Sequence, residues 1–145
     1  MSRLNTIAIA IKDRIEEIDS LFGYVIVYHR KNIASEFEAR MGKAKGKAVI
    51  VRLIEGKNTS RGKTTARFSG KYTVSVILEP ALNRKDAYDT DLLIESIAEK
   101  LHGWWPEESI PSNGLIWCDA DSITFPEDPE YDVSVLTLQA PKITD

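Results

Sequence analysis

Residues 47–79 read KAVIVRLIEGKNTSRGKTTARFSGKYTVSVILE, and this stretch decides the fold class. Its two ends are rich in β-branched and aromatic residues, a composition typical of strands. The first predicted strand covers residues 47–55, and the second lies within residues 67–79. Residues 56–64 between them contain two glycines and no apolar side chain. The sequence therefore predicts a long β-hairpin with an exposed, basic tip.

Apolar residues recur at helical spacing in two other segments. In residues 5–20 one face is formed by Ile7, Ile11, Ile15 and Ile18. A second helix is predicted to start at the potential cap Asp89-Thr90-Asp91 and to end at Gly103. Three further strands are predicted at 24–29, 115–125 and 131–140, and one or two helical turns at 32–41.

The order of these elements predicts a two-layer α+β domain. We expect a mostly antiparallel sheet of about five strands, with two main helices packed on one face and a long basic β-hairpin. No repeat, low-complexity tract or linker divides residues 1–145, so the chain is predicted to form a single domain.

The composition is that of an ordinary globular protein, with 43% hydrophobic and 28% charged residues. No apolar run approaches the roughly 20 residues of a membrane-spanning helix, and no secretory signal is expected. Cys118 is the single cysteine, which excludes an internal disulfide and a zinc site built from cysteines. Its apolar neighbours favour a structural thiol on a half-buried strand over a catalytic nucleophile. We expect a cytoplasmic protein without metal or cofactor.

The charges are strongly segregated along the chain, although the net charge is only −3. Residues 40–71 carry ten basic side chains against one acidic, Glu55, whereas residues 72–145 carry four basic and fifteen acidic side chains. The near-neutral total therefore conceals a dipolar molecule.

The hairpin tip is close to a phosphate-binding loop, but its spacing does not fit. Five residues separate Gly56 from Gly62 where that motif has four, and a strand rather than a helix is predicted to follow Lys63. A nucleic-acid-binding ribbon is a second interpretation, because its cations would attract a polyanion. Against it, no aromatic side chain lies at the tip to stack on bases, and the pI is about 5.5. A ribbon that docks on an acidic protein surface is favoured.

Three other sets of residues have both a structural and a functional interpretation. Asp119 and Asp121 alternate on a predicted strand and could converge on a hard cation, but exposed acids on edge strands are common. His102 suits the C-terminal end of a helix, which is a sufficient structural reason for it. Of Trp104 and Trp105, one is expected to close the end of the core and the other to be available to a partner.

Two motifs and the order of the elements point to a known family. The motifs are Leu101-His102-Gly103-Trp104-Trp105 and Tyr131-Asp132-Val133-Ser134-Val135-Leu136. With the N-terminal amphipathic helix and the long polar hairpin, they give residues 5–140 a layout that resembles phage tail terminator proteins. Within that group, the chain is most similar to the tail completion proteins of Mu-like phages and prophages.

This resemblance implies a non-enzymatic ring, typically a hexamer, that caps the tail tube, ends its polymerisation and joins it to the head. The implied partners are other copies of the chain, the tail tube protein and the neck or head connector protein, and no membrane. Passage of DNA through the ring is compatible with this role, but specific nucleic-acid binding is not expected. The implied location is the host cytoplasm during assembly, and then the tail of a virion or of a tail-like particle.

A head-to-tail ring uses two different surfaces of each subunit, and the opposite charges of the two chain segments offer such a pair. We predict that ring or tube contacts are made by Lys57, Arg61, Lys63, Arg67, Lys71 and Trp105. The alternative function is a small nucleic-acid-binding module that uses the basic hairpin, residues 56–71. A metal-dependent enzyme centred on Asp119 and Asp121 is a third, weaker hypothesis.

Overall fold

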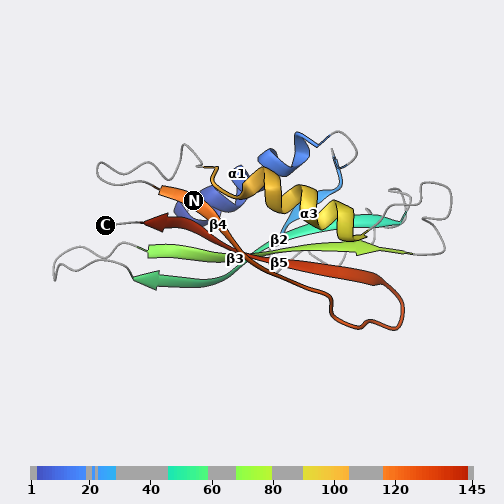
Figure 1. Cartoon of the computed structure of the whole chain (residues 1–145). Coiled ribbons are helices and arrows are strands. Elements are labelled where there is room, and N and C mark those ends of the chain that lie inside the picture. The colour runs from blue at the N-terminus through green and yellow to red at the C-terminus, as the bar shows by residue number, and fades with distance from the viewer. Residues whose placement is uncertain are drawn as a thin grey trace.

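In the part of the chain that the structure describes, a five-stranded sheet forms one layer and two helices form the other (Figure 1). The computed structural model describes residues 3–18, 21, 23–28, 46–58, 68–79, 90–104 and 116–143. In chain order the elements are α1 (Arg3–Glu16), β1 (Val25–Val27), β2 (Lys47–Asn58), β3 (Phe68–Leu78), α3 (Thr90–Leu101), β4 (Ile116–Thr124) and β5 (Asp132–Ile143).

The strand order in the sheet is β1-β2-β3-β5-β4. β1 pairs with β2 in parallel, and the other three strand pairs are antiparallel. The predicted α+β class, with a mostly antiparallel sheet and two helices, is therefore confirmed. β2 and β3, which the sequence places on either side of the predicted hairpin tip, pair with each other in the antiparallel sense. The connection at 59–67 and the helical turns predicted at 32–41 lie outside the described residues.

Alternation along the strands turns one face of the sheet towards the core. On β2 and β3 this face carries Val49, Val51, Val74 and Val76, all at most 1% exposed. Both helices cover the same face (Figure 1). They bury the stripes predicted from their periodicity, namely Ile7, Ile11 and Ile15 on α1 and Ile94, Ile97 and Leu101 on α3. Each fully buried aliphatic side chain stabilises the fold by about 1.5–3 kcal/mol.

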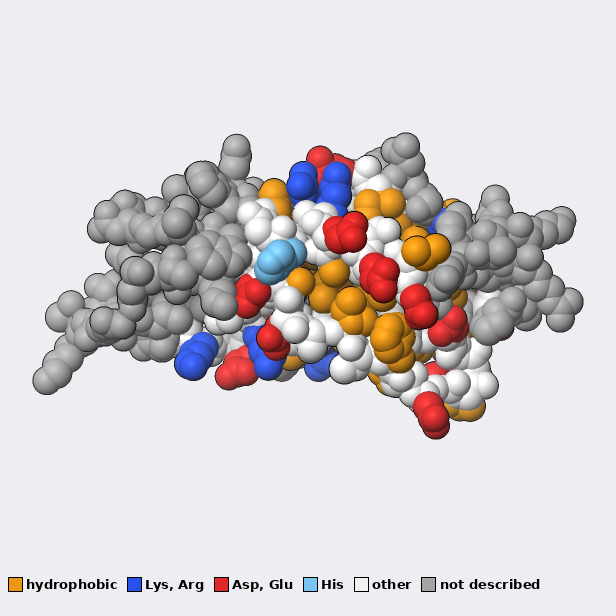
Figure 2. Space-filling model, in the orientation of Figure 1, with side chains coloured by type: hydrophobic (Ala, Val, Ile, Leu, Met, Phe, Trp, Pro, Cys, Tyr) orange, Lys and Arg blue, Asp and Glu red, His pale blue; other side chains and the backbone are white. Residues whose placement is uncertain are grey.

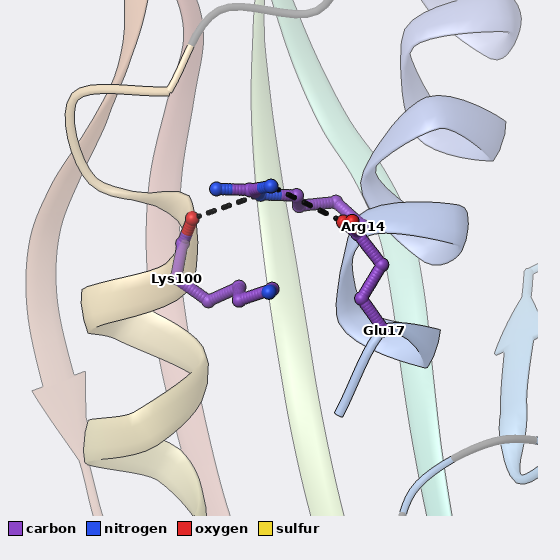
Figure 3. A network of polar contacts seen from close by, with 3 residues as sticks. All are labelled: Arg14, Glu17 and Lys100. Atoms are coloured by element: carbon purple, nitrogen blue, oxygen red, sulfur yellow. Dashed lines mark hydrogen bonds and ion pairs between the residues drawn. The ribbon is translucent and has the colours of Figure 1, made fainter. Parts of the chain in front are cut away.

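Arg14 joins the C-terminal ends of the two helices (Figure 3). Its Nε donates a hydrogen bond to the carbonyl oxygen of Lys100 at 3.2 Å, one of the carbonyls that the end of α3 leaves without a partner within the helix. Its Nη1 lies 3.2 Å from Oε2 of Glu17, and its guanidinium lies 5.5 Å from the centre of the Trp104 ring. One side chain thus fixes α1 against α3.

The exit from α3 pairs with the outer edge of β4. Gly103 adopts a φ of 78°, a left-handed conformation that glycine accepts without steric cost. Its N–H donates to the Cys118 carbonyl at 2.9 Å, and the Cys118 N–H donates to the Trp104 carbonyl at 2.7 Å. These bonds cover part of an edge strand that would otherwise present unpaired backbone groups. Trp104 is half-buried and packs against the core, as expected for one of the two tryptophans.

Gly70 leaves room for the buried ring of Tyr72 two residues further along β3. A Cβ atom at Gly70 would lie 2.5 Å from Cε2 of Tyr72, and Tyr72 is 0% exposed. The ring therefore occupies the space of the missing side chain at the base of the hairpin.

Three strands differ from the prediction by more than one residue at an end, and one of them, β2, continues past its predicted end, residue 55, to Asn58. β1 covers only Val25–Val27 of the predicted residues 24–29. β5 continues past its predicted end, residue 140, to Ile143. Pro141 is accommodated because the register between β4 and β5 shifts between Trp117 and Asp119, where an irregular ladder tolerates a residue without an N–H.

Candidate functional site

The described part of the predicted contact set is the base of the β2–β3 hairpin. Lys57 on β2 and Lys71 on β3 are both exposed, and Lys71 lies opposite Glu55. The other four residues of that set, Arg61, Lys63, Arg67 and Trp105, lie outside the described residues. Their contacts therefore stay predictions.

A β-bulge on β2 exposes an apolar side chain beside these lysines. The register shifts between Leu53 and Glu55, so Ile54 is the extra residue. Leu53 packs against the core, whereas Ile54 is 46% exposed. The neighbouring Arg52 is exposed as well, with its guanidinium 4.6 Å from the centre of the Tyr28 ring. We name the set Arg52, Ile54, Lys57 and Lys71 the basic corner.

Three of the four residues of the basic corner, Arg52, Ile54 and Lys57, lie on β2 beside an edge of the sheet. The pairing of β1 with β2 ends at Val51. Beyond that residue, no strand in the part of the chain that the structure describes pairs with this edge of β2. Gly56 is exposed, and because glycine has no side chain, this exposed surface belongs to the backbone. The backbone of β2 is therefore accessible here, as a strand edge must be to take part in an intermolecular contact.

The turn between β4 and β5 forms a second exposed surface, of opposite charge. Asp128 organises this turn, because its Oδ1 accepts hydrogen bonds from the N–H groups of Glu130 and Tyr131, both at 2.9 Å. Glu127 and Glu130 are exposed, and Phe125 before the turn is 56% exposed. The turn thus combines an accessible aromatic ring with carboxylates.

The first turn of α3 adds to the same end of the molecule. The last residues of α3 bond to Cys118, so its first residues point towards the opposite end of β4 (Figure 1). Leu92 is 63% exposed there, between the exposed Asp91 and Glu95. Figure 2 shows acidic and apolar side chains side by side in this region. We name the set Asp91, Leu92, Glu95, Phe125, Glu127, Asp128 and Glu130 the acidic corner.

The two corners lie diagonally across one sheet. β2 and β4 are separated by β3 and β5, and Lys71 and Leu78 mark the two ends, since Leu78 pairs with Asp132 next to the acidic turn. With a strand rise of about 3.3 Å and a strand spacing of about 4.8 Å, the corners are about 23 Å apart along the strands and about 14 Å across them. Both distances exceed the Debye length of about 8 Å at physiological salt. The two charges therefore hardly interact within one molecule.

Between the corners, the side chains on the sheet face opposite the helices change from charged residues near the hairpin to uncharged residues farther away. Rows of neighbouring side chains across β2, β3, β5 and β4 follow from the register. Nearest the hairpin the row is Glu55, Lys71, Gln139 and Asp119; the next is Arg52, Thr73, Thr137 and Ser122; a third is Ile50, Ser75, Val135 and Thr124. Neither described helix covers this face (Figure 1).

A hollow of about 240 Å³ on this face is lined by Glu55, Lys57, Gly70, Lys71, Asp121, Thr137 and Gln139. Two cations and two carboxylates face it, so its formal charge is balanced. It contains no apolar wall of the kind that binds most small ligands. The hollow therefore belongs to the surface of the hairpin base rather than to a ligand site.

Asp119 and Asp121 do not continue a regular alternation. Asp119 pairs with Gln139, but the register shifts between Ala120 and Ser122, which leaves Asp121 as the extra residue of a bulge. Asp119 instead lies 3.7 Å from Nδ1 of His102, and this nitrogen accepts a hydrogen bond from the Ala120 N–H at 3.1 Å. His102 thus holds the edge of β4. Among the described residues no group of three or more His, Cys, Asp and Glu side chains could hold a metal ion.

Cys118 is more deeply buried than the sequence predicted, since a half-buried strand was expected at this position. It is 0% exposed in the core, and this burial raises the pKa of its thiol to about 12. A protonated, inaccessible thiol is not a nucleophile. Burial also raises the pKa of the adjacent Tyr72, with a smaller contribution from the charge of Cys118. Cys118 therefore fits the interpretation as a structural thiol and not that as a catalytic nucleophile.

No family model matches the chain, and no curated protein sequence matches it. The helices in the described part of the chain are all too short and too polar to cross a membrane.

The acidic corner was missed from sequence, although the run Pro126-Glu127-Asp128-Pro129-Glu130 is a visible turn signal with three carboxylates. What the sequence does not give is the placement of Leu92 and Phe125 at the same end of the fold. Ile54 was missed because two consecutive apolar residues do not reveal which one faces the core.

Proposed function

We propose that this chain is a non-enzymatic assembly protein whose copies associate head to tail into a ring, in the manner of a phage tail terminator. The observation that supports this is the pair of exposed surfaces of opposite charge at diagonal corners of one sheet. A ring built from identical subunits needs two different, mutually complementary surfaces on each of them. The hexameric state and the tail-capping role come from the resemblance to tail terminators.

The strand edges support the same proposal. The edge of β2 beyond Val51 and the outward edge of β4 beyond Ala120 lie on opposite sides of the sheet. Backbone groups on two such edges can hydrogen-bond to neighbouring subunits on both sides. A role in assembly would use both edges, whereas a single-partner binding module would use one.

The chemistry of the described titratable groups is consistent with a structural role. The thiol of Cys118 is buried and protonated, and Nδ1 of His102 is occupied by a backbone N–H. The hollow beside the hairpin is lined by balanced charges. The Cys118 thiol is thus inaccessible to a substrate, and the exposed His102 uses Nδ1 for a structural contact with the edge of β4.

The test neutralises the predicted ribbon. In the variant Arg61→Gln, Lys63→Gln, Arg67→Gln, the circular dichroism spectrum and melting temperature should stay those of the wild type, because no described core residue changes. Rings seen by negative-stain electron microscopy for the wild-type chain should be lost in the variant. Rings of unchanged size and number in the folded variant would count against the proposal.

The second candidate function is binding of nucleic acid by the basic hairpin, and the exposure of Lys57 and Lys71 favours it. It predicts retention of DNA or RNA at low salt that weakens steeply as salt rises. A gel-shift titration at low salt decides it, since absence of any shift eliminates this function.

A further inference from the structure

Building on the proposed head-to-tail assembly, we infer that the acidic corner of one copy is the docking surface for the basic corner of the next copy. The occupant is a second copy of this chain. The chemistry of the contact is an apolar centre, formed by Leu92 and Phe125 on one side and Ile54 on the other, within a rim of opposite charges.

The apolar residues at the two corners are the most exposed large apolar side chains of the described residues, namely Leu92 at 63%, Phe125 at 56% and Ile54 at 46%. Single exposed apolar residues are common on protein surfaces. Here, however, Leu92 and Phe125 lie among exposed carboxylates, and Ile54 lies beside the exposed Arg52 and Lys57 as well as the exposed Glu55, so each has the charged surroundings of an interface with an apolar centre and a polar rim. Burying a phenylalanine and a leucine against an isoleucine would contribute affinity, and the charged rim would chiefly guide orientation.

The charges at the corners are complementary. The acidic corner contains Asp91, Glu95, Glu127, Asp128 and Glu130, and the described residues 90–96 and 124–133 contain no lysine or arginine. The basic corner contains Arg52, Lys57 and Lys71, and with Glu55 and Asp121 beside the two lysines its net formal charge is +1 (three cations against two carboxylates). A contact between the two corners therefore brings unlike charges together, whereas contact of either corner with itself brings like charges together.

A second copy explains both corners, and other partners explain only one of them. A polyanion such as DNA would account for the basic corner but not for the exposed Phe125 within the acidic one. A basic protein would account for the acidic corner alone. The diagonal placement also prevents the corners from meeting within one molecule, since they are about 27 Å apart by the strand rise and spacing. Both surfaces are therefore available for contacts between molecules.

The experiment reverses each corner separately. One variant carries Glu127→Lys and Glu130→Lys, which spares Asp128 and its turn hydrogen bonds. The other carries Lys57→Glu and Lys71→Glu. A matched control for the first variant, Asp13→Lys with Glu99→Lys, makes the same change in net charge as that variant at two exposed acids outside both corners. Sedimentation velocity over a concentration series measures assembly, and circular dichroism verifies that each variant folds.

We expect each reversed variant alone to assemble at least about tenfold more weakly than the wild type, and the control to assemble like the wild type. Mixing the two reversed variants in equal amounts should restore assembly, because alternating copies then present unlike charges at every contact. Phe125→Ser, which changes no charge, should weaken assembly by a similar factor through faster dissociation.

The results separate the inference from the proposed function. If the wild type assembles and the reversed variants assemble equally well, the assignment of the corners is overturned while the ring proposal stands. If the mixture fails to restore assembly, the pairing of these two corners is overturned. If the wild type stays monomeric at every concentration and salt, the proposed function falls together with the inference.

Discussion

Replacement of Gly70 by alanine should destabilise the protein by about 2 kcal/mol, because the ring of Tyr72 occupies the space that a methyl group needs. The added Cβ would lie 2.5 Å from Cε2 and 2.8 Å from Cζ and Oη of Tyr72. Carbon atoms prefer separations of about 3.5–4.0 Å, so the ring must move by about 1 Å. Tyr72 is 0% exposed and cannot move into solvent. Overpacking of this kind typically costs about 1–3 kcal/mol.

Urea unfolding of four proteins tests this explanation: the wild type, Gly70→Ala, Tyr72→Val and the double variant. Alanine at position 70 should cost little or nothing when valine replaces Tyr72, which gives a coupling energy of about 2 kcal/mol. Gly23→Ala is a contrasting control, since nothing lies within 4 Å of its Cβ but its φ is +84°. Its cost of about 1 kcal/mol should arise from the backbone and be independent of Tyr72. An equal cost of Gly70→Ala with and without the tyrosine ring would refute the steric explanation.

Three further predictions concern the core and the helix pair. Ser134→Ala should leave the free energy of unfolding unchanged or raise it by about 1 kcal/mol, because the buried Ser134 hydroxyl has no hydrogen-bond partner; a large loss in urea unfolding would reveal an overlooked partner. In the folded protein the thiol of Cys118 has a pKa of about 12, whereas in the unfolded chain its pKa is near 9.0. Stability should therefore be full below pH 9 and fall towards pH 12 by up to about 1.4 kcal/mol per pH unit. Unfolding curves from pH 7 to 11 should show a shallower fall for Cys118→Ala, and identical slopes would contradict the assignment. Arg14→Met should lose about 1–2 kcal/mol of stability with the bond to the Lys100 carbonyl and the contact with Trp104. Glu17→Gln should cost less than about 1 kcal/mol because that ion pair is exposed, so equal losses for the two variants would count against the role of Arg14.

The strands β2 and β3 and the two described helices were predictable because each depends on local patterns. The alternation in Lys71 to Leu78 fixed the core face of β3, and the spacing of Ile7, Ile11 and Ile15 fixed that of α1. These signals arise from the geometry of a single element and need no knowledge of its neighbours. The antiparallel class followed from the order of the elements along the chain, in which two pairs of strands are adjacent.

The placement of elements relative to one another was not predictable in the same way. The position of β5 between β3 and β4 brings the acidic turn to the end of the sheet opposite the hairpin connection. No local pattern encodes this order, because it results from long-range strand pairing. The bulges at Ile54 and Asp121 were also missed. A bulge adds one residue to one strand and leaves the composition of the segment unchanged.

The predicted contact residues divide in a similar manner. Lys57 and Lys71 are exposed at the hairpin base, where an interaction surface requires them to be. The exposure of Leu92 and Phe125 could not be read from the sequence, since the pattern of a single element does not show which of its apolar residues a neighbouring element covers. A charge count along the chain indicated a dipolar molecule, but only the sheet topology shows where its two poles lie.

Native mass spectrometry of the unmodified chain, recorded over a range of concentrations, tests most directly whether copies of this protein assemble with one another. We predict a single closed oligomer, six copies by analogy with tail terminators, whose population falls as salt rises. A chain that stays monomeric at all concentrations, or a continuous ladder of open oligomers without a preferred size, would contradict the ring.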